Sequence, residues 1–347
     1  MTTPPSNADP LDLLICSTCG TQFPETSGLT ACKICDDPRQ FVPPTGQSWT
    51  TLSTLRSEFY KNIFTPDPIH CEKLVSIHTE PRLAIGQRAY LCRTNTNTKS
   101  STSRRSGSSP DSTFNILWDC ITYIDDATIN EINKLGGIHA IVISHPHFYT
   151  THLVWAEIFD CPVYLSSEDE EWVVLKESEN KNQSQSDEGK GRKRQVFFSN
   201  NLLSFTASTS ENGNGIYEGD DGRADIVAIK AGGHFPGSTV LLWRSLKTLL
   251  IADTMAVVPS GKYWVDRPAG TASFTFMWSY PNMIPLSADD VHGIWKAIKH
   301  TVFDITRGAF VGMDTDTDSK KRMLDSAQIF VKSMGYLGHA IHQEKCL

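Results

Sequence analysis

Apolar residues alternate or cluster along this chain in a way that predicts strands in runs, each run closed by helices. Short segments rich in β-branched and aromatic residues predict strands at 74–78, 82–93, 114–120, 138–144, 162–167, 224–231, 239–244, 249–253 and 308–312. Apolar residues at helical spacing predict helices at 125–137, 151–160, 287–300 and 318–335. This order favours an α+β fold in which two sheets pack face to face and helices cover the outer sides.

Two of the predicted helices carry clear start signals, and polar stretches separate several elements. Asp125 or Asp126 is suited to cap the first helix, and Ser287 forms a capping box with Asp290 at the third. Low-complexity polar sequence predicts surface insertions between strands. We expect a flexible tail at 1–13, a four-cysteine module at 14–45 and the sandwich domain at 46–347, with insertions near 93–113, 176–196 and 208–224.

Composition narrows the class of protein. The 347 residues are 39% hydrophobic and 20% charged, so a sizeable core is expected. A formal charge of −7 argues against a nucleic-acid-binding surface, because phosphate contacts need concentrated Lys and Arg. We find no stretch of the roughly 20 apolar residues that cross a membrane and no secretory pattern at the start. A cytoplasmic protein is expected, although the run KGRKR at 190–194 could serve nuclear import instead of forming a loop surface.

Four of the nine cysteines are paired in two C-x-x-C units, Cys16 with Cys19 and Cys32 with Cys35. Twelve residues separate the two units, which allows four thiolates to surround one Zn²⁺ tetrahedrally. A segment this short has little apolar core, so the metal would supply its folding energy. We expect a structural zinc site, with a redox-active dithiol or unliganded cysteines as the alternatives.

A second group of metal-binding side chains follows predicted strands. His145 and His147 form an H-x-H unit after the strand at 138–144, and alternate positions of an extended chain point to the same side. His234 lies in a glycine-rich turn, AGGHFPGS, and Asp253 ends the strand at 249–253. Catalytic metal ligands are typically gathered from several strand ends, so this order predicts a second metal site.

The order of these motifs resembles that of the metallo-β-lactamase superfamily. That superfamily has H-x-H-x-D-H after a strand, a glycine-flanked His, an Asp at a strand end and a last His. The resemblance covers about residues 70 to 315 and implies an αββα sandwich. The segment SHPHFY, preceded by C-x-x-C pairs, looks like a branch with an N-terminal zinc-knuckle segment and an S-H-P-H-[FY]-Y motif. By this resemblance, His145, His147 and His234 form a three-His site and Asp253 a bridging ligand.

The chain departs from the superfamily pattern at the second metal position. Tyr149 and Thr150 stand where the pattern has Asp and His, and the last His has no counterpart. Three of the four second-site ligands are therefore absent, and we expect one active-site ion, Zn²⁺ or Fe²⁺. His152 could be a substitute ligand, or it could lie on the helix surface or cap the helix. Among the other histidines, His139 is expected to be structural, and four are expected to face solvent: His292, His300, His339 and His342.

These residues lead to a functional hypothesis. Zn²⁺ bound by imidazoles lowers the pKa of bound water to about 7, so the site would hydrolyse an ester, lactone, thioester or amide of a small-molecule substrate. Asp253 would orient the water, and Tyr149 would donate a hydrogen bond to an oxyanion or would only pack at the cleft rim. Two alternatives stay open: an iron oxygenase using His145, His234 and Asp253, and a catalytically degenerate binding protein. The aromatic-rich segment 262–285 could wall a pocket or lie in the core.

Overall fold

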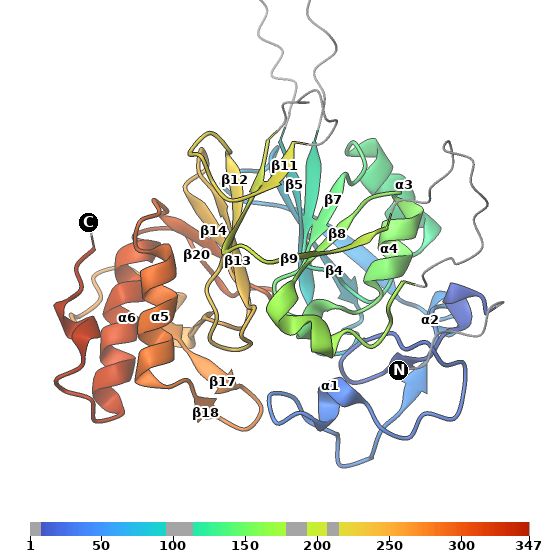
Figure 1. The fold of residues 1–347 in the computed structure, drawn as a ribbon, viewed down its shortest axis with the longest axis horizontal. Helices are drawn as coiled ribbons and strands as arrows, with labels where there is room; N and C mark the ends of the chain where they lie inside the picture. Colours follow the sequence, from blue (N-terminus) through green and yellow to red (C-terminus); the bar gives the residue numbers. More distant parts are fainter. Residues whose placement is uncertain (1–7, 95–113, 178–192, 207–214, 347) are drawn as a thin grey trace, which may run out of the picture.

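The computed structural model describes residues 8–94, 114–177, 193–206 and 215–346 and shows two sheets packed face to face (Figure 1). In order across the first sheet, the strands are β3 (Lys61–Pro66), β4 (Leu74–Glu80), β5 (Arg88–Arg93), β6 (Asn115–Trp118), β7 (Ala140–Val142), β8 (Val163–Ser166) and β9 (Gln195–Phe198). Across the second sheet they are β11 (Ile216–Glu218), β10 (Leu202–Phe205), β12 (Ile226–Lys230), β13 (Thr239–Trp243), β14 (Thr248–Leu250), β19 (Ile305–Arg307) and β20 (Asp314–Thr315).

Helices cover the outer side of each sheet (Figure 1). Helices α3 (Asp126–Lys134) and α4 (His152–Ile158) pack on the first sheet, and α5 (Ala288–Ile298) and α6 (Ser319–Ser333) pack on the second. The αββα sandwich predicted from the sequence is confirmed. Asp125 accepts a hydrogen bond from Thr128 N and Ser287 accepts one from Asp290 N, so both predicted helix starts are correct.

Strand alternation divides the apolar residues into three layers. In β5, Ala89 and Leu91 face α3 and α4, while Tyr90 and Cys92 face the other sheet. Since successive side chains of a strand point to opposite faces, each central strand contributes to two cores at once. The layer between the sheets is closed by large side chains such as Trp118 and Trp243.

Two predicted strands are misplaced in part. The strand predicted at 82–93 begins only at Arg88, because Gly86, at φ 82°, donates its N–H to Leu83 O and closes a turn there. The strand predicted at 308–312 does not form there, and the strand in this region is β19, which ends at Arg307. Gly308 passes so close to the carbonyl of Met313 that a Cβ would lie 2.3 Å from that oxygen, so the chain reverses here into β20.

The N-terminal segment forms a small module beside the sandwich, next to the β17–β18 hairpin (Figure 1). The short elements here and nearby are η1 (Pro10–Asp12), β1 (Ile15–Cys16), α1 (Lys33–Asp36), β2 (Trp49–Thr50), α2 (Leu52–Ser57), β15 (Ala256–Val257), η4 (Pro259–Gly261), β16 (Phe274–Thr275), β17 (Met277–Ser279) and β18 (Ile284–Pro285). Within the predicted flexible tail, η1 is capped by Asp9 and Leu13 is buried. The last short elements are η2 (Pro146–Phe148), η3 (Ser167–Trp172) and η5 (Ala340–Gln343).

The polar insertions fall largely on residues 95–113, 178–192 and 207–214, which lie outside the described residues. Strand β11 lies within the third predicted insertion and pairs with β10. Of the helices in the described part of the chain, none is both long and apolar enough to cross a bilayer.

Candidate metal centres

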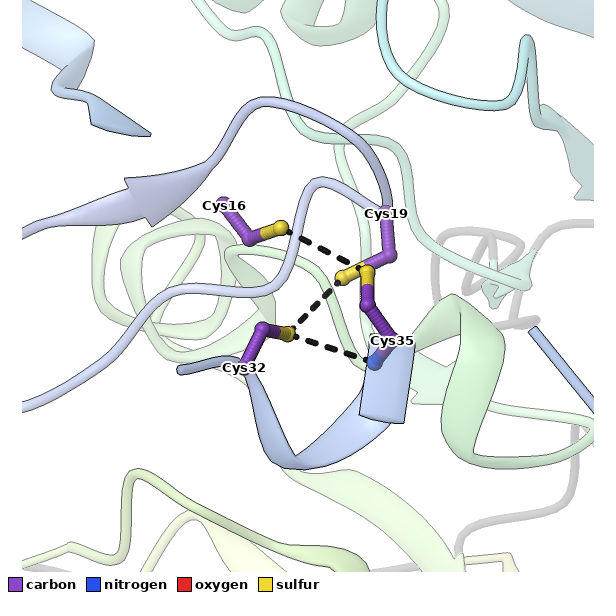
Figure 2. Close-up of side chains that lie close together, drawn as sticks. All are labelled: Cys16, Cys19, Cys32 and Cys35. Atoms are coloured by element: carbon purple, nitrogen blue, oxygen red, sulfur yellow. Dashed lines mark hydrogen bonds between the residues drawn. The ribbon is translucent and has the colours of Figure 1, made fainter. Parts of the chain in front are cut away.

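Four cysteine thiols converge in the N-terminal module (Figure 2). The Sγ atoms of Cys16 and Cys35 lie 3.6 Å apart, and those of Cys19 and Cys32 also lie 3.6 Å apart. All four sulfurs are within 4.8 Å of one another. Zinc–sulfur bonds of about 2.3 Å place the sulfurs of a tetrahedral site about 3.8 Å apart. The thiols are not joined as disulfides, and their spacing fits one Zn²⁺.

The surroundings of these thiols suit thiolate ligands. Helix α1 starts at Cys32, whose sulfur accepts a hydrogen bond from Cys35 N. Burial raises the pKa of Cys19 well above its ordinary value, so a cation is needed before all four sulfurs carry charge. The apolar cluster of the module consists of the four cysteines with Phe23 and Ile34, and a core this small gives the metal a structural role.

The second cluster joins His145, His147, His234 and Asp253, with one ligand atom of each within 4.8 Å of the others. Asp253 Oδ2 lies 3.2 Å from His145 Nε2 and 3.3 Å from His147 Nδ1. His234 Nε2 lies 3.2 Å from His147 Nδ1 and 3.9 Å from Asp253 Oδ2. Ligand bonds of about 2.0–2.1 Å give tetrahedral edges of about 3.3 Å, so the donor atoms fit around one cation. The predicted convergence is confirmed.

Outer hydrogen bonds orient two of the imidazoles. His145 Nδ1 lies 2.8 Å from Ser144 Oγ, and His234 Nδ1 donates to Met277 O at 3.1 Å. Each bond holds Nδ1 and leaves Nε2 facing the cluster, as metal-ligating histidines require.

The ionisation of the cluster also favours a cation. Burial lowers the pKa of His147 to about 4 and that of His234 well below its ordinary value, so both rings are neutral at pH 7. Burial opposes ionisation of Asp253, but the neighbouring histidines lower the pKa of that carboxyl well below its usual range. Neutral imidazoles and an ionised carboxylate are the forms that bind zinc and other divalent metals.

Local backbone geometry explains how the ligands reach one point. The segment after His145 is the 3₁₀ turn η2 rather than the extended chain expected for H-x-H, because Pro146 starts a tight turn. The turn brings His147 back towards the cluster, which it faces with Nδ1 instead of Nε2. Gly233, at φ 88°, lets the chain pass beside Thr254, where a Cβ would lie 2.9 Å from its hydroxyl oxygen.

A cavity of about 630 Å³ opens beside this second cluster. Asp253 lies in its wall, and side chains from distant segments complete it: Arg39, Phe41, Ile85, Tyr280, Phe310, Val311 and Met313, among others. The Tyr280 hydroxyl is buried and has no hydrogen-bond partner among the described residues. Its ring centroid lies 6.0 Å from that of His234. Burial, reinforced by Asp253, raises the pKa of Tyr280 well above its ordinary value, so this hydroxyl stays protonated.

Other candidate residues lie outside the cluster. The Tyr149 hydroxyl donates to Asp169 O at 3.3 Å. His152 is buried, not on the helix surface as considered from sequence, and its ring bonds Tyr149 O at 2.6 Å and Gln195 Nε2 at 2.7 Å. Both ring nitrogens of His152 are therefore engaged away from the metal ligands.

His139 has its expected role, His292 does not, and the aromatic segment contributes to both the core and the cavity. His139 Nδ1 accepts a hydrogen bond from Asn115 N, which confirms a structural role. His292 was expected to face solvent but is buried, with Nε2 3.0 Å from Glu344 Oε1, since the C-terminal segment covers α5. Within 262–285, Phe274 and Phe276 lie in the core whereas Tyr280 lines the cavity.

Sequence patterns did not single out Tyr280, Arg39 or Gln87 as site residues. Arg39 and Tyr280 reach the cavity from loops without periodic patterns. Gln87 lies just before β5, and its side-chain amide donates to His147 O. Tyr280 had one weak signal, the density of aromatic residues around it.

Comparison with known proteins gives similar solved structures and one similar curated sequence. No family model matches the chain. Solved structures similar to it include the metallo-β-lactamase FIM-1 from Pseudomonas aeruginosa in a mono-zinc form (13% identity, 78% of this chain, 96% of that chain, TM-score 0.43). A metallo-β-lactamase from Hirschia baltica is also similar, with 10% identity, coverage of 78% of this chain and 97% of that chain, and a TM-score of 0.43. The chemotaxis sensor ODP in a peroxy diiron form has 13% identity, coverage of 79% of this chain and 99% of that chain, and a TM-score of 0.41.

A curated relative is far more similar in sequence. The uncharacterized protein YmaE of Bacillus subtilis (strain 168) is 35% identical over 301 residues, which cover 85% of this chain and 88% of YmaE. In its strand order and layers the chain is a metallo-β-lactamase-like sandwich, and a four-cysteine module precedes the sandwich. By its identity to YmaE, the chain belongs to the same protein family as that protein.

Proposed function

We propose that this protein is a metal-dependent hydrolase that uses a single ion at His145, His147, His234 and Asp253 to cleave an ester, lactone, thioester or amide. The convergence of these four donors beside a cavity is the observation that carries the proposal. A divalent ion bound there, Zn²⁺ or Fe²⁺, would polarise a carbonyl and lower the pKa of a water molecule. Three imidazoles with one carboxylate suit zinc-type hydrolysis better than the face of two histidines and one carboxylate used by iron oxygenases.

The surrounding residues support one ion rather than two. Tyr149 and Thr150 occupy the positions at which the superfamily pattern has two further ligands. The Tyr149 hydroxyl bonds Asp169 O, and Thr150 Oγ1 bonds Phe148 O. Neither side chain offers an ionised donor to a second cation.

Asp253 and Tyr280 have complementary roles in this proposal. Asp253 is ionised and lines the cavity, so its carboxylate accepts a hydrogen bond from the attacking water and orients that water towards the carbonyl carbon. Tyr280 presents to the same cavity a protonated hydroxyl that has no partner among the described residues, and it donates a hydrogen bond to the carbonyl oxygen as negative charge develops. We assign this donor role to Tyr280 in place of Tyr149, whose hydroxyl is already bonded.

The cavity lining indicates the shape of the substrate. Phe41, Ile85, Phe310, Val311 and Met313 give it apolar walls, and Phe41 and Val311 are 42% and 58% exposed. Exposed large apolar side chains gathered at one opening are typical of a ligand site. We therefore expect the acyl or leaving group to be apolar and the reacting carbonyl to sit near Tyr280 and Asp253.

A hydrolysis assay with matched substrates tests this function. Purified protein, loaded with Zn²⁺ or Fe²⁺, is assayed against esters, lactones, thioesters and amides of increasing acyl length. We expect turnover to rise with acyl length and to disappear in His234→Ala. The control is His300→Ala, which replaces an exposed histidine outside the cluster and should retain activity. Activity that persists in His234→Ala would refute the metal-dependent mechanism. Oxygen consumption without hydrolysis would favour the oxygenase, and neither activity would favour a binding protein.

A further inference from the structure

Gln87 links the four-cysteine module directly to a ligand of the second metal site. Its side-chain amide donates to Cys19 O at 2.8 Å and to His147 O at 3.2 Å. Gln87 is only 4% exposed. One buried amide therefore fixes the distance between the first C-x-x-C turn and the H-x-H turn.

Arg39 makes a second link, from the other C-x-x-C unit. It follows Cys35 by four positions and is paired with Asp37 through Nε at 2.7 Å and Nη2 at 3.0 Å. Its Nη1 donates to His234 O at 3.2 Å. Its guanidinium lies 3.7 Å from the centroid of the Phe235 ring, and that ring lies 5.1–5.7 Å from the rings of all three histidines.

A third contact shows how closely the module and the domain pack. The Thr122 hydroxyl donates to Gly20 O at 3.2 Å, and a Cβ on Gly20 would lie 2.0 Å from that hydroxyl oxygen. Gln22 N donates to Thr150 O, next to the H-x-H turn. Each half of the module thus touches a loop that carries or adjoins a histidine ligand.

From these contacts we propose that the four-cysteine module is a positioning element for the second metal site, and that Gln87 and Arg39 transmit its state. Metal loading of the cysteines then raises the metal affinity of the histidine cluster, and metal loss from the module lowers it. The proposal rests on the metal site of the proposed function but not on its reaction.

The physical reason is the narrow tolerance of metal coordination. Metal–ligand distances must hold within about 0.2 Å, and groups that orient the ligands typically change metal affinity 10–100-fold when they are altered. The core of the module consists largely of the cysteines themselves, so its shape depends on its ion. Gln87 and Arg39 bond the backbone carbonyls of His147 and His234, so a change in the shape of the module displaces these two ligands. Because binding free energies at two coupled sites are reciprocal, the histidine site should also affect the cysteine site.

Cobalt binding by the full-length protein tests the proposal without any substrate. Thiolate-to-cobalt charge-transfer absorption reports the cysteine site, and the weaker d–d bands of cobalt bound by nitrogen and oxygen report the histidine site. The variants are Gln87→Leu and Arg39→Met. Gln328→Leu is the matched control for the glutamine, since Gln328 Nε2 also donates to two backbone carbonyls, at 3.0 and 3.1 Å. Arg322→Met is the matched control for the arginine, since Arg322 is buried and stacks on Trp264 at 4.2 Å.

We expect Gln87→Leu and Arg39→Met to weaken cobalt binding at the histidine site by about tenfold or more, with the thiolate band retained and both controls at the wild-type value. If Gln87→Leu does not fold, Gln87→Asn, which shortens the amide by one methylene, should show the same change. Arg39→Lys should not restore affinity, because a lysine lacks the planar fork that bonds Asp37 and His234 O together.

A cysteine variant provides the second arm. Cobalt affinity at the histidine site is compared between wild-type protein whose cysteines are loaded with Zn²⁺ and the double variant Cys16→Ser/Cys35→Ser, whose cysteine site is disabled, and higher affinity in the loaded form is expected. Equal affinity in both forms, together with wild-type affinity in Gln87→Leu and Arg39→Met, overturns the coupling, as does a histidine site that binds no cobalt at all. Coupling observed in a protein without hydrolase activity would instead overturn only the proposed function.

Discussion

His145 Nε2 lies 3.2 Å from Asp253 Oδ2, although the two residues follow strands of different sheets. His145 comes after β7 in the first sheet and Asp253 after β14 in the second. The metal site therefore bridges the ends of the two sheets, and its geometry depends on how the sandwich closes. This arrangement makes the cluster sensitive to the loss of a single ligand.

Replacement of His145 by Ala removes one donor of the histidine cluster and leaves Asp253 without its nearest imidazole. We expect the metal content to fall from two ions per chain to one, with the remaining ion on the cysteines. Elemental analysis after gel filtration measures this directly. His139→Ala removes a histidine that is not one of the donors and that accepts a hydrogen bond from Asn115 N, so this variant should retain two ions. Two metal ions per chain in both variants would contradict the site.

Cys35→Ser tests the cysteine site in the same way. A hydroxyl is a poor zinc ligand compared with a thiolate, so we expect loss of this ion and increased proteolysis of the N-terminal module. Cys92→Ser is the control, since Cys92 is buried between the sheets and outside the thiol cluster. Equal zinc content in the two variants would show that the four thiols do not hold an ion.

Tyr280→Phe removes only a hydroxyl from the cavity wall. If that hydroxyl donates to the developing oxyanion, kcat/KM should fall by about 10²-fold, with metal content unchanged. The hydroxyl of Tyr149 already bonds Asp169 O, so Tyr149→Phe should lower kcat/KM much less. Steady-state kinetics on the best substrate compare the two, and the opposite ranking would restore the donor role to Tyr149.

His152 should make stability depend on pH. Burial lowers the pKa of His152 from 6.5 to about 4 in the folded protein. The unfolded chain then binds more protons between these values, so stability is complete above about pH 6.5 and is lost as the pH falls towards 4. The contribution is about 3 kcal/mol. Urea unfolding at several pH values measures it.

Two variants isolate that contribution. His152→Asn should show a shallower fall in the free energy of unfolding between pH 6.5 and 4 than the wild type. His300→Ala, which alters an exposed histidine, should leave the slope unchanged. An identical slope in His152→Asn would mean that His152 is not the group that titrates.

The sequence was informative where local chemistry controls structure. Periodic apolar residues predicted α3, α5 and α6, and a side-chain cap at Asp125 or Ser287 depends only on neighbouring backbone. The four thiols were also identified from the spacing of the two C-x-x-C units, and the four donors of the second cluster from their places at strand ends and in a glycine-rich turn.

What the sequence did not reveal depends on long-range packing. Arg39 and Gln87 bond carbonyl oxygens that lie far along the chain, and any residue can supply a carbonyl. His147 uses Nδ1 because Pro146 starts a turn where an extended chain was expected. His292 is buried by the C-terminal segment, through a contact with Glu344 that no periodicity indicates. These features follow from the folded arrangement rather than from any local pattern.

The central claim is that one cation binds between His145, His147, His234 and Asp253. Anomalous diffraction from crystals of the purified protein, collected at the zinc and iron absorption edges, tests it most directly. We expect one anomalous peak among these four donors and a separate zinc peak among Cys16, Cys19, Cys32 and Cys35. Crystals of metal-replete protein with a peak at the cysteines and none at the histidine cluster would contradict it.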